Sequence, residues 1–544
     1  MAEKNMFDEN PVLRRHQADA LAKIQEIIDS GEGKGRIVLP TGTGKTRIEV
    51  EAVCNIIKKN IKDGKWGGIH VILSPRILLA YQQLDEFIKI MTKNGIDCRW
   101  MVVNSGGLNS EQYKAQLEAL GVEDSEDIGC TTKTETIQGE MEIEKDKRPF
   151  VIFSTYHSVD RVNTAAENLA IKIQSYIFDE AQYCVTSGSF KDALDFESSF
   201  KFFFTATEKW TDNEEEGYGM NNESRFGKLI FTEKPRTLIE RGEMASVAIH
   251  EIRMVEDRDM DKREWSNMAS AIVLAFDKHK EVVKKFSFSP TTIGPKMIVV
   301  CDCQSSLEGI MNSKVMKEYK TSHQTVNLCG LSSNFGIEIN GNKKPKANNR
   351  EKQSLLKEMR GWKSADEAII LHVDMIGEGI DVAGITAIMP FRNFGKIKFL
   401  QNIGRGTRLV KNDRERLYRE EILPADLKSS DKGGKYVKPY CWLVLPVLSS
   451  DYKDTKERYA KYILTLRKDY GFDTSEMVVL TSGPGEDWPE GEKKKEKKTA
   501  FFGIVNIIEE LDIIEEEIKI DEATHTLNTL TEEGLSELIM GLGK

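Results

Sequence analysis

The chain has 544 residues, of which 40% are apolar and 30% are charged. This composition is globular and excludes disordered, fibrous and collagen-like proteins. Its 77 Lys and Arg residues stand against 87 Asp and Glu residues, a net charge of −10. The protein therefore does not coat nucleic acid through bulk charge, although a local basic cleft stays open.

The N-terminus and the cysteines indicate the compartment. The first ten residues have no apolar core, and no apolar run approaches the ~20 residues of a membrane span. The eight cysteines are scattered without a CxxC pair, which favours buried free thiols over disulfides or a zinc site. We therefore expect a cytoplasmic protein with no signal peptide and no membrane partner.

Short, uniformly apolar runs alternate with helical patterns along most of the chain. Such runs are typical of parallel sheets that are covered by helices on both faces. They form two sets, the first at 35–40, 68–74, 150–155, 175–180 and 200–207, the second at 296–302, 325–330, 368–375, 385–390 and 440–446. The predicted fold class is α/β, with two parallel-sheet domains over residues 1–245 and 246–448.

The character of the sequence changes after residue 448. Residues 451–470 have the pattern of a polar-faced helix, and residues 500–544 return to helical apolar spacing. Between them, residues 481–499 are charged and poor in apolar residues, which indicates a linker. We expect residues 449–544 to form a small helical appendage, whose helices could dock a protein partner.

The strongest local signal is LPTGTGKT at 39–46, between an apolar run and a helical pattern. This strand–loop–helix context is the one that a phosphate-binding loop requires. Gly42 and Gly44 would let backbone N–H groups face the phosphates. Lys45 would reach the β- and γ-phosphates, and Thr46 would be a ligand of Mg²⁺.

A second signal is IFDEAQ at 177–182, where two carboxylates end an apolar run. On its own such a pair is most often a solvated strand end. Downstream of a phosphate loop it suits metal-assisted phosphoryl transfer. Asp179 would hold Mg²⁺, and Glu180 would orient and deprotonate the attacking water.

The third signal is QNIGRGTRL at 401–409, in the second predicted domain. An arginine supplied across an interface stabilises negative charge on the γ-phosphate in the transition state. Arg405 and Arg408 are the candidates. For this pattern in isolation, two solvated arginines on a surface helix would be the simpler interpretation.

Taken in order, the motifs resemble those of superfamily 2 helicases and translocases over about residues 13–410. Besides the three signals above, the matching segments are RRHQADAL (14–21), LSPRILLAYQ (73–82), FSTYHSV (153–159), FTAT (204–207), VVCDCQSS (299–306) and VDMIGEGIDV (373–382). The segment GYGMNNESRFG (217–227) further resembles the helicase parts of restriction-enzyme and mobile-element proteins. The resemblance implies two RecA-like domains with ATP and Mg²⁺ between them.

The same resemblance implies a role for each matching residue. Gln17 would contact adenine, and the arginines of 401–409 would act as arginine fingers. The nucleotide would be held by Thr41, Gly42, Thr43, Gly44, Lys45 and Thr46 of the first domain and by Gly379 and Asp381 of the second. Pro75, Arg76, Thr155 and Ser305 would line the nucleic-acid track, and Thr205 and Thr207 would couple this track to the nucleotide site.

Three positions depart from the family pattern: Gln182 in the D-E box, Glu208 after Thr207, and Val373 in place of a phosphate-contacting Thr. Val373 and Gln182, together with the Gln401 start of the segment 401–409, argue against the D-E-A-D RNA-helicase subgroup. By the same resemblance, these variants fit translocation on double-stranded DNA better, which favours DNA over RNA. His16, His70, His157 and His372 have no partner at metal-ligand spacing, so we interpret them as structural.

The function predicted is an ATP-dependent DNA helicase or translocase. Two alternatives stay open from the sequence. The chain could be the motor subunit of a restriction or defence assembly with the nuclease on a partner chain, or an ATPase that senses RNA or duplexes without unwinding them.

Overall fold

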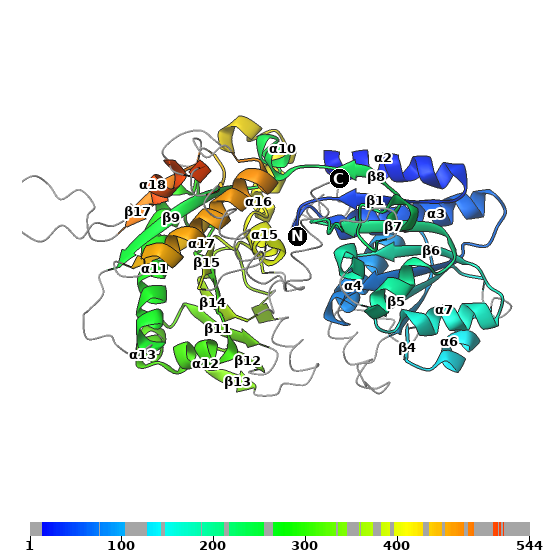
Figure 1. Ribbon diagram of the computed structural model, residues 1–544, viewed down its shortest axis with the longest axis horizontal. Helices are drawn as coiled ribbons and strands as arrows, with labels where there is room; N and C mark the ends of the chain where they lie inside the picture. The colour runs from blue at the N-terminus through cyan, green and yellow to red at the C-terminus, as the bar shows by residue number, and fades with distance from the viewer. Residues whose placement is uncertain are drawn as a thin grey trace, which may run out of the picture.

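The computed structural model has two α/β domains, each built on one large sheet (Figure 1). It describes residues 13–75, 77–103, 128–142, 147–185, 188–211, 217–254, 265–332, 336–344, 358–359, 361–373, 382–391, 396–427, 435–448, 452–472, 477–482, 504–509, 511–512 and 515.

The first sheet has eight strands in the order β4-β3-β5-β2-β6-β7-β1-β8, and all of them pair in parallel. Its strands are β1 (Gly33–Val38), β2 (Ile69–Ser74), β3 (Arg99–Val103), β4 (Ile128–Thr131), β5 (Phe150–Thr155), β6 (Ile173–Phe178), β7 (Ser198–Thr205) and β8 (Lys228–Thr232). Since parallel strands end at one edge, the turns that follow β1, β2, β5, β6 and β7 all face the same way. This edge carries the first domain's motifs.

Helices cover both faces of this sheet, and alternate residues of each strand point to opposite faces. On one face, Ile37 and Ile72 pack with α2 (Arg15–Ser30), α3 (Lys45–Lys62) and α4 (Ile77–Lys93). On the other, Val71 and Leu73 pack with α6 (Thr134–Met141) and α7 (Val159–Asn168). Short turns complete the domain: η3 (Ala181–Val185), α8 (Gly188–Lys191), η4 (Asp192–Leu194) and α9 (Glu223–Phe226). The short helix α10 (Pro235–Glu240) follows β8 and packs against the second domain.

The second sheet has nine strands in the order β13-β12-β11-β14-β10-β15-β16-β9-β17. The pairs β11–β12 and β12–β13 are antiparallel, and the other pairs are parallel. Its strands are β9 (Ser246–Met254), β10 (Lys296–Val300), β11 (Asn327–Ser332), β12 (Gly336–Ile339), β13 (Asn342–Lys344), β14 (Ala368–His372), β15 (Ala387–Pro390), β16 (Tyr440–Leu448) and β17 (Val479–Ser482). The predicted fold class, two tandem RecA-like α/β domains, is therefore confirmed.

The helices of the second domain also lie on both faces of its sheet. One face is covered by α11 (Trp265–Phe286), α12 (Gln304–Asn312) and α13 (Lys314–Ser322). The other face packs against α10 and α15 (Lys396–Gly406), with α16 (Lys411–Tyr418) and η6 (Pro424–Leu427) beside them.

The described part of the segment after residue 448 belongs to the second domain's core. Its elements are α17 (Tyr452–Thr465), the π-helical turn η7 (Leu466–Tyr470), β17 and α18 (Ile504–Glu509), and the helices pack into the same hydrophobic cluster as α15. Because β17 pairs with β9, residues 481 and 482 lie in a strand. The predicted start of the charged linker at 481 is therefore wrong, and the segment is not purely helical. The domain boundaries themselves stay predictions.

The described residues bear on the expectations about the cysteines and about membrane-spanning helices. Cys54, Cys98, Cys184, Cys301, Cys329 and Cys441 are buried free thiols, and Cys303 is an exposed one. Across the part of the chain that the structure describes, no helix combines the length and the apolar character that a membrane span requires.

Candidate nucleotide site at the domain interface

The phosphate loop lies between β1 and α3, as the sequence predicts. Gly42 has φ 89° and Gly44 has φ 81°, a left-handed conformation that glycine adopts without strain. Gly44 is the N-cap of α3, and Lys45 begins the helix. The N–H groups and the positive end of the helix dipole therefore meet at Lys45 and Thr46, which is a suitable place for phosphate.

Three side chains at the start of α2 hold this loop from behind through one carbonyl. The Thr43 carbonyl accepts hydrogen bonds from Arg14 (2.6 Å), His16 Nε2 (3.0 Å) and Gln17 Nε2 (3.1 Å). Gln17, expected at adenine, thus braces the phosphate loop here, and its adenine contact stays a prediction. The sequence did not identify Arg14 and His16 as partners of the loop.

A buried cluster of carboxylates lies beside Lys45. Gln83 Nε2 donates to Asp179 Oδ2 (2.8 Å) and to Glu49 Oε2 (3.3 Å). Burial, reinforced by the negative charge of Glu180, raises the pKa of Asp179 to about 7, and burial also raises the pKa of Glu49. The ionised forms of these carboxylates are therefore destabilised, and a bound cation would stabilise them.

This donor set fits Mg²⁺, which proteins usually hold with one or two carboxylates together with substrate phosphates. Asp179 and Thr46 would supply the hard oxygens, and Glu49 Oε1 is buried without a hydrogen-bond partner. Among the described residues, no group of three or more His, Cys, Asp or Glu side chains is arranged to hold a metal ion. Glu49 and Gln83 were missed by the sequence analysis, although Glu49 lies one helical turn after Lys45.

A chain of hydrogen bonds joins the segment IFDEAQ (177–182) to the segment FTAT (204–207). Gln182 Nε2 donates to Glu180 Oε2 (2.7 Å), and Gln182 Oε1 accepts from the Thr205 hydroxyl (2.6 Å). The Thr207 N–H donates to Thr205 Oγ1 (3.0 Å). The two threonines predicted to couple nucleotide and nucleic acid are thus connected to Glu180 through Gln182.

The second domain closes on the phosphate loop through α15. A Cβ added at Gly42 would lie 2.6 Å from Arg408 Cγ, and one added at Gly404 would lie 2.5 Å from Thr41 Cβ. These backbones approach so closely only because both positions are glycine. Arg408 therefore lies directly against the phosphate loop, and Arg405, three residues earlier, is buried within α15.

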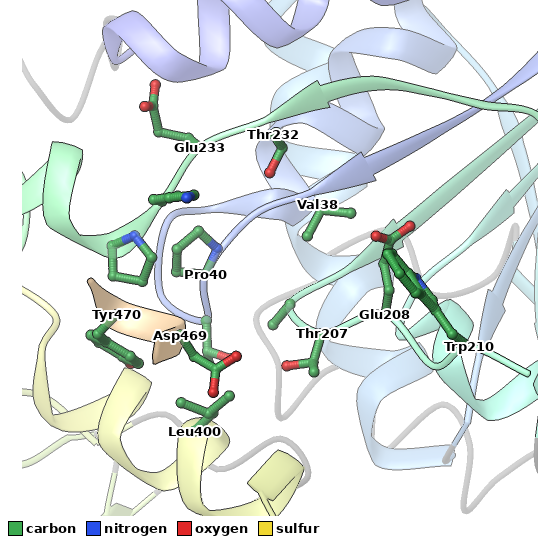
Figure 2. A pocket seen from close by; sticks show the side chains of 14 residues that line it. Val38, Pro40, Thr207, Glu208, Trp210, Thr232, Glu233, Leu400, Asp469 and Tyr470 are labelled. Atoms are coloured by element: carbon green, nitrogen blue, oxygen red, sulfur yellow. The ribbon is translucent and has the colours of Figure 1, made fainter. Parts of the chain in front are cut away.

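A cavity of about 420 Å³ adjoins this contact (Figure 2). Val38, Pro40 and Thr207 line it from the first domain, while Leu400, Asp469 and Tyr470 line it from the second. The cavity lies at the interface between the domains, next to the predicted nucleotide site.

Two of the predicted nucleic-acid residues, Pro75 and Thr155, lie at the ends of neighbouring strands. Pro75 follows β2, and Thr155 ends the neighbouring β5, where Ser74 is its register partner. Ser305 lies near the start of α12. Thr155 is buried, with its hydroxyl bonded to Ser158 at 3.2 Å, so a direct contact would require this side chain to become exposed. Arg76, Gly379 and Asp381 lie outside the described residues.

The fold is therefore two tandem RecA-like domains that meet at a phosphate loop, with Arg408 of the second domain beside it. Residues 10–209 match the family described as type III restriction enzyme, res subunit. This match covers most of the first domain. No curated protein matches the chain by sequence.

Solved structures of restriction enzymes and of a helicase share the fold. The ATP-dependent type ISP restriction-modification enzyme LlaBIII, bound to DNA, has a TM-score of 0.58 at 15% identity over 88% of this chain and 32% of its own. A nuclease-deletion mutant of the type ISP enzyme LlaGI, in complex with a DNA substrate mimic, has a TM-score of 0.52 at 15% identity over 86% of this chain and 30% of its own. Mss116p, bound to single-stranded RNA and AMP-PNP, has a TM-score of 0.51 at 15% identity over 88% of this chain and 76% of its own.

These matches confirm the resemblance to superfamily 2 helicases related to restriction-enzyme subunits. The chain spans about a third of the length of the two restriction-modification enzymes. At 15% identity the structures show the shared fold, and the activity of this chain has to be argued from its own residues.

Proposed function

We propose that the protein is a nucleic-acid-stimulated ATPase that moves along or remodels DNA. The observation that carries this proposal is the contact of Arg408 with Gly42. This contact brings a cation of the second domain to the phosphate loop of the first, on the same sheet edge as Asp179 and Glu180. Hydrolysis at such an interface is coupled to the closing and opening of the two domains.

Each residue has one task in this reaction. The N–H groups after Gly42 and the ammonium of Lys45 bind the phosphates, and Glu180 orients water and accepts its proton. Arg405 and Arg408 offset charge that develops on the γ-phosphoryl oxygens. Mg²⁺, when held by Thr46 and Asp179, would neutralise charge on the β- and γ-phosphates.

DNA is favoured as the track by the sequence departures at Gln182 and Val373. The titles of the two type ISP structures name DNA or a DNA mimic, whereas that of Mss116p names RNA. Phosphate contacts would dominate binding and give little sequence specificity. We expect the protein to act in the reducing cytoplasm, where its buried thiols stay free.

A second candidate is the motor part of a restriction-type assembly. It is favoured by the match of residues 10–209 to a restriction-enzyme subunit and by the larger size of the type ISP enzymes. The described C-terminal elements would then belong to the motor, because they pack into its core. Gel filtration with and without DNA, followed by assays of the lone chain, separates the two candidates: an independent motor acts without a second protein.

The direct test is the rate of ATP hydrolysis with single-stranded DNA, duplex DNA, forked DNA and RNA, in the wild type and in Lys45→Ala. We expect the wild type to be stimulated most by DNA. Removing the ammonium should lower turnover by about 10²–10³-fold, because an electrostatic contact to the reacting phosphates is lost. Near-normal stimulated turnover in Lys45→Ala would contradict the assignment of the phosphate loop. Strand displacement beside triplex displacement then distinguishes unwinding from translocation.

A further inference from the structure

The C-terminal end of α15 leaves main-chain carbonyls that need partners. The last carbonyls of any α-helix lack an intrahelical donor. Here the Thr407 carbonyl accepts from the Ala245 N–H at 2.9 Å, and the Ile403 carbonyl accepts from the Thr407 N–H at 2.9 Å. The carbonyls of Gly406 and Arg408 accept hydrogen bonds from the ammonium group of Lys438.

We propose that Lys438 is a positioning residue, whose ammonium fixes the backbone between Arg405 and Arg408 so that both guanidinium groups meet the γ-phosphate. The inference rests on the proposed ATPase function. Lys438 bonds one carbonyl on each side of Thr407, so it determines the path of the chain between the two arginines. Its own contact with nucleotide is not required.

The position of Lys438 is itself fixed by buried groups. Asp413 on α16 accepts from the Val437 N–H at 2.7 Å and from the Lys438 N–H at 2.8 Å, and the Asp413 side chain is fully buried. Ser287 donates to the Val437 carbonyl at 2.7 Å. The segment before β16 is therefore held on both sides, which makes the ammonium of Lys438 a rigid donor.

Gly406 and Thr407, the two residues between Arg405 and Arg408, are also tightly packed by other elements. A Cβ added at Gly406 would lie 2.1 Å from Cys441 Sγ, so the helix end lies directly on β16. The Tyr470 hydroxyl hydrogen-bonds the side chain of Thr407. Contacts from β16 and η7 thus enclose Gly406 and Thr407, and the arginines on either side cannot shift freely.

The charge of Lys438 suits this role. A cation near a helix C-terminus is favoured by the helix dipole. Burial lowers the pKa of Lys438 to about 8, while Asp413 and Cys441 act to raise it and Arg408 acts to lower it. The ammonium also repels the neighbouring guanidinium of Arg408, which favours an orientation of that side chain away from β16 and toward Gly42.

The experiment compares Lys438→Met with Lys296→Met. Lys296 is a matched control because it is also buried, its pKa is also lowered to about 8 by burial, and its ammonium also donates to two carbonyls, those of Lys363 and Ser364, both at 2.8 Å. Lys296 begins β10, at the opposite end of the sheet strands from the motifs. The two variants should therefore lose similar stability but differ in catalysis.

We expect Lys438→Met to lower kcat of ATP hydrolysis by about 10²-fold, since a misplacement of about 1 Å has this effect on catalysis. KM for ATP should stay within about twofold, because the phosphate loop is unchanged. Lys296→Met should leave kcat and KM near the wild type. Lys438→Met should also have little further effect in an Arg405→Ala/Arg408→Ala background, since it acts through those arginines.

Equal kcat in Lys438→Met and wild type would overturn the inference, as would an equal loss in Lys296→Met or an undiminished effect in the background without the two arginines. If Lys438→Met does not fold, Lys438→Gln, whose shorter and uncharged side chain also removes the ammonium, is measured against Lys296→Gln with the same criteria. The wild-type rate of ATP hydrolysis is measured first, with and without nucleic acid. If nucleic acid does not stimulate it, the proposed function itself is contradicted, and not only the role of Lys438.

Discussion

At the scale of single residues, the structure gives a reason for Gln182, which departs from the family pattern. Its amide donates to Glu180 and accepts from Thr205, so both of its polar ends are used in a buried position. Glu180 itself has φ 51°, a left-handed conformation that costs about 1–3 kcal/mol for a residue with a side chain. The hydrogen bond from Gln182 helps to hold the carboxylate in this strained position.

We predict that Glu180→Gln binds ATP and DNA but hydrolyses ATP very slowly. The amide keeps the shape of the side chain and loses the base. Filter binding in the presence of ATP should show more DNA retained than with the wild type. The matched control is Glu233→Gln, a carboxylate at the interface cavity that pairs with Arg241 at 2.9 Å. Weaker retention of Glu180→Gln with ATP would exclude the assigned role.

The sequence predicted the residues that form local patterns and missed those that meet only through the fold. Gly42, Lys45 and Asp179 follow strands and were identified from spacing. Gln83 lies mid-helix on α4, and its bonds to Asp179 and Glu49 depend on how that helix packs across β2. No short sequence pattern encodes such a contact.

At the scale of elements, α15 and the phosphate loop form the contact on which the account depends. Gly404 lies inside α15, where glycine is intrinsically unfavourable by about 1 kcal/mol relative to alanine. The nearest atoms to an added Cβ all belong to Thr41 of the other domain. Gly404 therefore allows the domains to close at some expense to the helix.

We predict that the Gly404→Ala variant folds normally but that its two domains close poorly on each other. Overpacking costs about 1–3 kcal/mol, so DNA-stimulated turnover should fall about tenfold or more. Gly139→Ala on α6 is the matched control, because a Cβ there meets no atom within 4 Å. Thermal unfolding and steady-state turnover of both variants provide the measurement. Unchanged turnover in Gly404→Ala would mean that this contact is not made during catalysis.

The strands were predicted unevenly, for a physical reason. Central strands such as β5 and β14 are buried on both faces, and their uniformly apolar residues revealed them. The edge strands β8 and β17 are only half buried or exposed, so their residues are mixed and gave no clear signal. The predicted start of the linker at residue 481 falls inside β17, because this strand forms only by pairing with β9, more than 220 residues earlier.

At the scale of the whole molecule, a second tie joins the phosphate loop to the connection between the domains. His16 Nε2 must donate to the Thr43 carbonyl, since a carbonyl only accepts, and His16 Nδ1 lies 2.7 Å from Glu243 Oε2. Glu243 lies between α10 and β9, where the first domain leads into the second. His16 is thus structural, as predicted, and it links the loop to the hinge region.

We predict that DNA binding weakens steeply with salt despite the net charge of −10. Each neutralised phosphate contributes about −0.9 to the slope of log affinity against log salt for duplex DNA. Fluorescence anisotropy across a range of salt concentrations gives this slope directly. A slope near zero would mean that the protein has no phosphate track and would contradict the translocase proposal.

The measurement that tests the central claim most directly is kcat of ATP hydrolysis in wild type and Arg408→Ala, with and without duplex DNA. If the second domain completes the site, Arg408→Ala should lower kcat by about 10³-fold and abolish stimulation by DNA, with a smaller loss of ATP affinity. Arg416→Ala, which removes an arginine that bonds the Lys435 carbonyl on the same domain, should leave both unchanged. Full DNA-stimulated turnover in Arg408→Ala would contradict the account.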